Sequence, residues 1–246
     1  MPHRSIYIGY DPREHQAFTV ARWSANQHSS VRTKVHGIAL QHVQSLGWYN
    51  RPTKVDEQGR AIDVISEAPM STEFAITRFL VPELVRKQGK GGWALFMDCD
   101  VLVRRDLDWL FWRAEASPDK ALFCVQHDHK PDQVTKMDGR VQQQYARKNW
   151  SSVMLLNVDH PANQALTIDL INTVPGRDLH RFCWLEDQHI GWLPHEWNYL
   201  VGYSQSTIDP AIVHWTSGGP WFPQYANAPF ADEWRDALQA SIVEPE

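Results

Sequence analysis

The sequence predicts an α/β fold, a three-layer sandwich with a mainly parallel central sheet, in a single domain over residues 1–246. Two observations support this. Segments rich in β-branched and aromatic residues alternate with segments of helical periodicity, which is typical of parallel sheets covered by helices. In addition, the strand-like segment 93–97 is apolar throughout, as in a central strand covered on both faces.

The elements follow this alternation in order. Asp11 and Pro12 provide an N-cap and a first helical position, and the glycines at 89–92 end the second helix. Residues 47–70 read as a long loop, and the polar stretch 128–149 as a mobile excursion. The predicted strands are 6–10, 35–40, 93–97, 101–103, 121–125, 153–158 and 211–215. The predicted helices are 11–27, 71–88, 161–174 and one that begins at 231.

The composition excludes several classes of protein. With 246 residues, 43% of them hydrophobic, the chain is neither disordered nor a small disulfide scaffold. A net charge of −5 argues against nucleic acid as a partner, because such binding needs a basic excess. No stretch approaches the roughly 20 apolar residues of a membrane span. Three scattered cysteines favour a reducing compartment, and we expect a cytoplasmic protein.

Candidate chemistry lies where predicted strands end, because ligands of open α/β sheets bind beyond the carboxyl ends of the strands. Asp11 follows the first strand, Asp98 and Asp100 follow the apolar strand, and His214 ends a late strand. Two carboxylates so close repel each other unless a cation or a proton lies between them. Carboxylates favour Mg²⁺ or Mn²⁺, and an added imidazole favours Mn²⁺. The alternatives are an ordinary turn for the acids and a structural role for His214.

Two further segments offer binding groups. The backbone N–H groups of Gly218 and Gly219 can approach an anion closely. Asp187 and Gln188 supply an acid and an amide, although their spacing alone cannot separate a sugar site from a helix start. The clusters around His127 and His180 lack a credible fourth ligand for zinc, so a solvated loop and a helix face are the better interpretations.

The segment 96–103, with Asp98-Cys99-Asp100, resembles the D-x-D strand of GT-A-fold glycosyltransferases, whose sheet is Rossmann-like. The other motifs, in order, resemble glycosyltransferase family 8 and its bacterial and phage relatives. They run over nearly the whole chain: 6–11 as the nucleotide-binding strand, 72–84 with Arg78, 150–157, Asp187-Gln188, 193–198 with the pattern L-P-x-x-W-N, and 212–221 with its final Pro-Trp.

The resemblance implies a metal-dependent glycosyltransferase that retains anomeric configuration and uses a nucleoside diphosphate sugar, commonly a UDP-sugar. It implies Asp98, Asp100 and His214 as ligands of Mn²⁺ or Mg²⁺. Asp187 would hold the donor sugar with Gln188 beside the anomeric carbon. The donor-binding residues would be Gly9, Tyr10, Asp11, Arg78, Asp98, Cys99, Gly218, Gly219 and Trp221. A saccharide, a lipid-linked sugar and a protein side chain all stay open as acceptors.

The chain departs from the family pattern in two places. Gly219 stands where the family has a phosphate-binding lysine, so leaving-group stabilisation would fall on the metal, backbone N–H groups and a cation such as Arg78. The family's F-N-A-G motif becomes Trp150-Ser151-Ser152, which affects the identity of the donor sugar.

Two other functions remain open. A phosphatase of the haloacid dehalogenase type also has D-x-D after an apolar strand, but that motif normally opens its domain, and Leu102 replaces the expected Thr or Ser. A carbohydrate- or nucleotide-binding domain impaired in catalysis would explain the missing lysine. A sugar-facing wall would account for five of the 12 tryptophans, with core packing as the alternative for each: Trp184, Trp192, Trp197, Trp215 and Trp221.

Overall fold

The computed structural model describes residues 3–31, 33–128, 147 and 149–243. Its centre is a six-stranded sheet in the order β10-β8-β9-β6-β1-β2. Three strand pairs are parallel, whereas β9 runs antiparallel to β6 and β8. The predicted α/β class with a mostly parallel sheet is therefore confirmed. The strands are β1 (Arg4–Tyr10), β2 (Val35–Ala39), β6 (Trp93–Met97), β8 (Leu122–Cys124), β9 (Val153–Asn157) and β10 (Ile190–Trp192).

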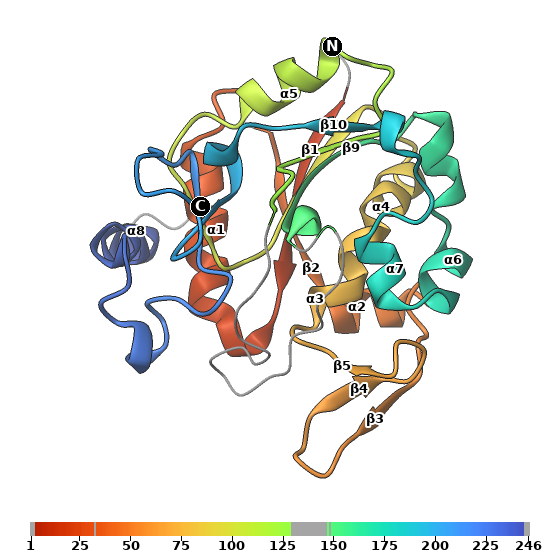
Figure 1. Ribbon diagram of the computed structural model, residues 1–246, viewed down its shortest axis with the longest axis horizontal. Coiled ribbons are helices and arrows are strands. Elements are labelled where there is room, and N and C mark those ends of the chain that lie inside the picture. The colour runs from red at the N-terminus through yellow and green to blue at the C-terminus, as the bar shows by residue number, and fades with distance from the viewer. Residues whose placement is uncertain (1–2, 32, 129–146, 148, 244–246) are drawn as a thin grey trace.

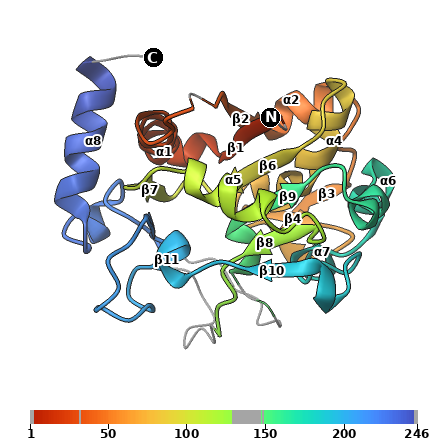
Figure 2. The same ribbon diagram turned by 90° about the horizontal axis from the view of Figure 1, so that it is seen from above.

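Helices cover both faces of this sheet, as Figures 1 and 2 show. On one face lies α1, which also contacts α8. On the other face lie α3, α4, α6 and α7. The central strand β6 is buried over its whole length, as its apolar sequence predicts. The helices are α1 (His15–Gln27), α2 (Leu40–Ser45), α3 (Phe74–Thr77), α4 (Val81–Lys87), α5 (Asp108–Glu115), α6 (Ile168–Thr173), α7 (Gly176–His180) and α8 (Ala231–Val243).

A second, three-stranded sheet lies beside α1 and receives the chain directly from β6. Its order is β11-β12-β7, with β11 (Tyr199–Leu200), β12 (Ile212–His214) and β7 (Val101–Val103). The segment Asp98-Cys99-Asp100 is thus the link between the two sheets. In the antiparallel β12–β7 pair, His214 lies opposite Val101. The register therefore brings His214 beside the acid pair, although 113 positions separate His214 from Val101 in the sequence.

Residues 47–70, predicted to be a loop, contain a small antiparallel sheet, so that prediction is wrong. The strands are β3 (Thr53–Val55), β4 (Ala61–Asp63) and β5 (Ala68–Pro69), and they extend away from the main body (Figure 1). All three residues of β3 are exposed, which explains the lack of a hydrophobic pattern. A buried ion pair between Arg51 and Asp63 anchors the base of this sheet.

The predicted helices are present, but several are interrupted. Asp11 caps a 3-10 turn, Pro12–Glu14, that leads into α1, so the predicted helix start is confirmed. The predicted helix 71–88 consists of α3, the 3-10 turn η2 (Arg78–Leu80) and α4. The excursion expected over 128–149 lies outside the described residues except for positions 128, 147 and 149. The single-domain boundary 1–246 stays a prediction.

Candidate functional site

The acid pair stands where the apolar strand β6 ends. The backbone N–H of Asp98 donates to the carbonyl oxygen of Ser152 at 2.9 Å, and the N–H of Trp215 donates to the carbonyl oxygen of Asp100 at 3.0 Å. Ser152 directly precedes β9, and Trp215 directly follows β12. The backbone of both acidic residues is therefore held by strand ends from two sheets, rather than by a free-standing turn.

Asp98, Asp100 and His214 converge on one point. Each offers one ligand atom, and these atoms all lie within 4.8 Å of one another. His214 Nε2 is 3.3 Å from Asp100 Oδ1, and the imidazole is buried. Two hard carboxylate oxygens and one borderline imidazole nitrogen form a donor set that suits Mn²⁺ and accepts Mg²⁺. The three residues thus fit the divalent metal expected from the sequence.

Arg78 faces the same cluster from the turn η2. Its guanidinium lies 2.8 Å from Asp98 Oδ1 and donates to the carbonyl oxygen of Ser151 at 2.9 Å. The guanidinium also lies over the rings of Phe74 and Phe96, at 5.4 and 5.2 Å from their centres. Arg78 is buried, and it partly neutralises the acid pair. The predicted donor-binding arginine therefore contacts a predicted metal ligand.

The end of β1 is tightly packed. A Cβ at Gly9 would lie 2.4 Å from the Phe74 ring, so only glycine fits there. Tyr10 packs edge-on against Phe18, with ring centres 5.0 Å apart. These contacts fix the backbone at the carboxyl edge of the sheet, where the family resemblance implies a nucleoside.

Asp11 is buried and serves as a cap. Burial alone would raise the pKa of its carboxyl, but hydrogen bonds from Arg13 and from the backbone N–H groups of Arg13 and Glu73 outweigh burial and lower that pKa. Both carboxylate oxygens thus have protein partners. A direct contact of Asp11 with a nucleoside stays a prediction, beside this structural role.

Cys99, between the two acids, is fully buried. Its Sγ lies 3.8 Å from a carboxylate oxygen of Glu14. Burial raises the pKa of the thiol well above its ordinary value, and the surrounding acidic charges raise that pKa further. Cys99 is therefore a neutral thiol that packs the link between the sheets.

Gly218 and Gly219 are required for two different reasons. Gly218 has φ +124°, a backbone conformation that residues with a side chain rarely adopt. A Cβ at Gly219 would lie 2.1 Å from the Trp221 ring. The Trp221 ring also packs against Trp215 and Trp234. The missing lysine thus corresponds to a position that an indole ring covers.

Asp187 and Gln188 lie on a separate 3-10 turn, Asp187–His189, and are not among the residues of the metal cluster. Asp187 is an exposed carboxylate that pairs with Arg147, and Arg147 lies over the Trp150 ring. Gln188 donates to Glu186 at 2.7 Å. Sequence reasoning gave Arg147 no role, because nothing in its surroundings marks it.

Asn198 also contacts a candidate site residue, His214, and sequence reasoning gave its side chain no role. It is fully buried, and its Oδ1 lies 2.8 Å from His214 Nδ1. The L-P-x-x-W-N motif drew attention to this segment, but only the fold shows that the side chain of Asn198 touches a predicted metal ligand.

The five tryptophans do not form a sugar-facing wall. Trp197 and Trp215 are 4% and 1% exposed, and Trp197 stacks on Trp109. Trp215 and Trp221 belong to a small hydrophobic cluster with α8, and Trp184 packs between Phe79 and Phe182. Of the five, only Trp192 is largely exposed, at 59%. Core packing is thus the correct interpretation for most of this set.

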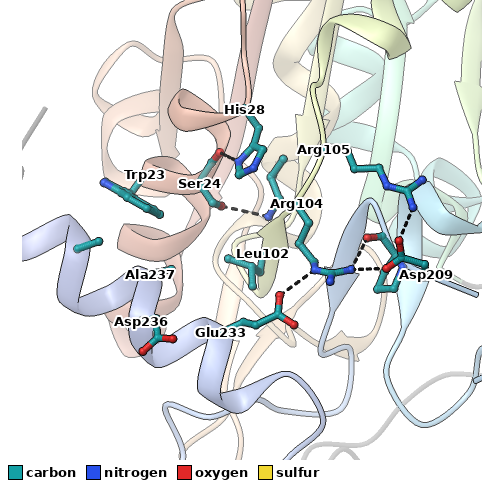
Figure 3. A pocket seen from close by; sticks show the side chains of 13 residues that line it. Trp23, Ser24, His28, Leu102, Arg104, Arg105, Asp209, Glu233, Asp236 and Ala237 are labelled. Carbon is teal, nitrogen blue, oxygen red and sulfur yellow. Dashed lines mark hydrogen bonds and ion pairs between the residues drawn. The ribbon is translucent and has the colours of Figure 1, made fainter.

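Two cavities lie beside the described elements. One, of about 560 Å³, opens between α1, β7 and α8 (Figure 3). Four of its charged groups pair with one another, since Arg104 binds both Asp209 and Glu233 at 2.8 Å and Arg105 binds Asp209. The other, of about 270 Å³, is lined by His127, His195 and residues of β11 and the following turn, and Leu200 in its wall pairs with His214.

The histidine clusters that the sequence offered as weak metal candidates have other partners. His180 Nδ1 lies 2.6 Å from Ser151 Oγ, and the rings of His160 and His189 meet edge-on. Within the described ranges, the acid pair with His214 is the one group whose ligand atoms lie close enough together to hold a metal. In the same ranges, no helix has the length and apolar character needed to span a bilayer.

The chain resembles known proteins both in sequence and in structure. No model of a known protein family matches the chain. Protein CDI of Arabidopsis thaliana is 41% identical over 240 residues, which cover 95% of this chain and 85% of that protein. The glycosyltransferase GlyE of Streptococcus pneumoniae TIGR4 has a TM-score of 0.59 at 16% identity, with 97% of this chain and 60% of GlyE covered. The galactosyltransferase LgtC, solved with donor and acceptor sugar analogues, has a TM-score of 0.59 at 12% identity, and the match covers 98% of each chain.

These likenesses agree on the architecture. The match to LgtC spans both chains almost completely, whereas this chain spans only 60% of GlyE. The fold is therefore that of GT-A glycosyltransferases, as the motifs predict, with the Asp98, Asp100 and His214 cluster at the carboxyl edge of β6.

Proposed function

The chain belongs to the family of the Arabidopsis thaliana Protein CDI, and on that premise and its GT-A fold we propose that it is a metal-dependent glycosyltransferase. It transfers a sugar from a nucleoside diphosphate sugar to an acceptor. The observation that carries the proposal is the convergence of Asp98, Asp100 and His214 within 4.8 Å in this fold. We further propose that it is related to glycosyltransferase family 8 and retains anomeric configuration.

The acid pair and His214 would hold Mn²⁺ or Mg²⁺. When bound, the ion supplies charge neutralisation for the diphosphate of the donor. The buried imidazole and the backbone contacts of Asp98 and Asp100 fix these ligands before a donor arrives. Little rearrangement is then needed on binding, which favours tight binding of the charged donor.

Arg78 is the cation that we propose for the leaving diphosphate. It lies 2.8 Å from Asp98, so it can stay beside the acid pair or turn toward a phosphate oxygen. Gly219 replaces the lysine of the resembling family, and the backbone N–H groups of Gly218 and Gly219 would add to the binding of the phosphates. Gly9, Tyr10, Asp11, Cys99 and Trp221 would complete the donor site.

Asp187 and Gln188 would act on the sugar. The exposed carboxylate of Asp187 can accept hydrogen bonds from donor-sugar hydroxyls once Arg147 turns aside. Gln188 would lie beside the anomeric carbon. The donor is proposed to be a UDP-sugar, and the acceptor a saccharide, a lipid-linked sugar or a protein side chain.

One of the two other functions, the phosphatase, is less favoured by the structure. A haloacid dehalogenase-type phosphatase needs its first Asp as a nucleophile, but Asp98 is paired with Arg78 and the chain has the fold of GT-A glycosyltransferases. A binding domain that has lost transfer would keep the nucleotide site, so it differs from the proposal only in turnover.

The cytoplasmic location also stays a proposal, supported by three free cysteines, two of them buried.

A turnover assay separates these functions. The purified protein is incubated with a panel of UDP- and GDP-sugars, with Mn²⁺ or with EDTA, and release of the nucleoside diphosphate is measured. We expect release from a UDP-sugar that EDTA abolishes, with water acting as a slow acceptor. Hydrolysis of p-nitrophenyl phosphate without nucleotide would support the phosphatase instead. Absence of turnover with every donor, despite nucleotide binding, would support the impaired binding domain.

A further inference from the structure

Asn198 connects a predicted metal ligand to the start of β9. It lies in the 3-10 turn His195–Asn198, immediately before β11, and is fully buried. Its carboxamide spans two partners: one end lies 2.8 Å from His214 Nδ1 and the other 2.9 Å from Ser152 Oγ. A buried amide with partners on both sides has no freedom to turn without losing hydrogen bonds.

The hydrogen bonds fix which end of the carboxamide faces His214. The hydroxyl of Ser152 donates its single proton to the carbonyl oxygen of Asn149 at 2.8 Å. That hydroxyl can then only accept from Asn198, so the amide nitrogen of Asn198 faces Ser152. The same nitrogen lies 3.3 Å from the Asn149 carbonyl oxygen, a second acceptor. The amide oxygen of Asn198 consequently faces the imidazole.

An amide oxygen can accept but not donate, so Nδ1 of His214 must carry the proton of this hydrogen bond. The lone pair of a neutral His214 then lies on Nε2, the nitrogen that faces Asp100 at 3.3 Å. Ligand histidines commonly use one nitrogen for the metal while the other donates to an oxygen that fixes the ring.

Ser152 also contacts the other half of the cluster. Its carbonyl oxygen accepts the backbone N–H of Asp98, while its hydroxyl accepts from Asn198. Ser152, immediately before β9, thus contacts Asp98 at the end of β6 directly and His214 on β12 through Asn198.

We propose that Asn198 is a positioning residue for the metal site. It fixes His214 in the tautomer that presents Nε2 toward Asp98 and Asp100, and through Ser152 it holds the two halves of the cluster in register. This inference rests on the proposed function, because the tautomer matters only if His214 binds a metal ion through Nε2.

The test compares three variants for Mn²⁺ binding without any nucleotide, measured by electron paramagnetic resonance of the free ion. We expect Asn198→Ala to weaken Mn²⁺ binding about 10- to 100-fold, the effect typical of lost outer-shell partners. Asn198→Asp keeps an acceptor for Nδ1, and Ser152 can turn to donate to it, so we expect binding within about threefold of wild type. Asn163→Ala, a fully buried asparagine with partners elsewhere, is the matched control and should leave Mn²⁺ binding unchanged.

A second readout does not depend on the metal. Nitrogen-15 NMR of metal-free protein labelled at histidine reports which ring nitrogen of His214 is protonated. We expect the Nδ1-protonated pattern in wild type and Asn198→Asp, and a loss of that preference in Asn198→Ala. Wild-type Mn²⁺ affinity or an unchanged tautomer in Asn198→Ala would overturn the inference. If wild type itself does not bind Mn²⁺, the proposed function fails, and the tautomer measurement still decides the role of Asn198.

Discussion

Arg78 moderates the repulsion between two acids that stand one residue apart. Its guanidinium pairs with Asp98, while Asp100 faces His214. Each carboxylate therefore has its own positively charged or ionisable neighbour. This division of partners explains how the acid pair can remain ordered next to a fully buried strand, where unpaired charges would be costly.

Asp187 gives a prediction on donor recognition. We expect Asp187→Ala to weaken binding of the UDP-sugar by at least about tenfold, because a hydrogen bond to a charged group contributes about 1.5–3 kcal/mol. Binding of UDP alone should not change, since the carboxylate is proposed to touch only the sugar. Titration calorimetry with both ligands checks this, and Asp178→Ala, on helix α7, is the matched control. Equal losses for UDP and the UDP-sugar would remove Asp187 from the sugar site.

Gly219 gives a prediction on the missing lysine. Gly219→Lys restores the residue of the resembling family, but its Cβ would lie 2.1 Å from the Trp221 ring. We expect the substitution to lower the free energy of unfolding by about 1–3 kcal/mol, as overpacking does. Urea unfolding measures this. When Trp221→Ala is already present, adding Gly219→Lys should lower the free energy of unfolding much less than it does in wild type. Unchanged stability in Gly219→Lys would show that the indole ring moves freely.

At the level of elements, sequence patterns predicted the strands that are buried on both faces. Segment 93–97 has an apolar residue at every position, and it forms β6. Short elements with mixed exposure gave no such pattern. All three residues of β3 are exposed. The nearby buried ion pair joins Arg51, which precedes β3, to Asp63, which lies on the partner strand β4. The strand propensity of the residues alone therefore does not identify short, exposed strands such as β3.

The ion pair of Arg51 and Asp63 anchors the small sheet to the main body. Both side chains are buried, and Arg51 also donates to the carbonyl oxygens of Ile171 and Val174, at the end of α6. Burial alone would raise the pKa of Asp63, but hydrogen bonds from Arg51 and Ser66 outweigh burial and lower that pKa.

We expect Asp63→Ala to lower the free energy of unfolding by about 3–5 kcal/mol, because it leaves the buried guanidinium of Arg51 uncompensated. Since folding lowers the pKa of Asp63, its contribution is complete above its ordinary pKa of 3.8 and is lost as the pH falls through the folded-state pKa. The stability difference between wild type and variant should therefore shrink in acid. Urea unfolding at several pH values measures it, and a difference that grows below pH 3.8 would contradict the account.

On the scale of the whole molecule, the candidate site lies at the junction of two sheets. The chain passes from β6 through the acid pair into β7, and β12 pairs with β7 so that His214 meets Asp100. The sequence places each of these residues at a strand end, and the family resemblance implies that the three act together as metal ligands. Asn198 lies 16 positions before His214, and the parallel pairing of β11 with β12 brings the two side chains together, so their contact could not be predicted from local pattern.

The packing of the tryptophans near the site motifs is also explained only by the whole molecule. A small hydrophobic cluster containing Trp215 and Trp234 holds α8 against α1 and the three-stranded sheet. Proximity in sequence to the site motifs suggested contact with sugar, but side chains on one strand alternate between faces. His214 faces the acid pair, and the next residue, Trp215, packs into this cluster.

The most direct test of the central claim is calorimetric titration of UDP into the protein with Mn²⁺ and with EDTA. The account predicts binding that requires Mn²⁺ in wild type. It predicts a loss of more than about 100-fold in Asp100→Ala, beyond the 10- to 100-fold typical of outer-shell partners. Asp209→Ala, an exposed acid that pairs with Arg104 and Arg105, is the matched control and should bind like wild type. UDP binding that is equal in EDTA, or that survives in Asp100→Ala, would contradict the account.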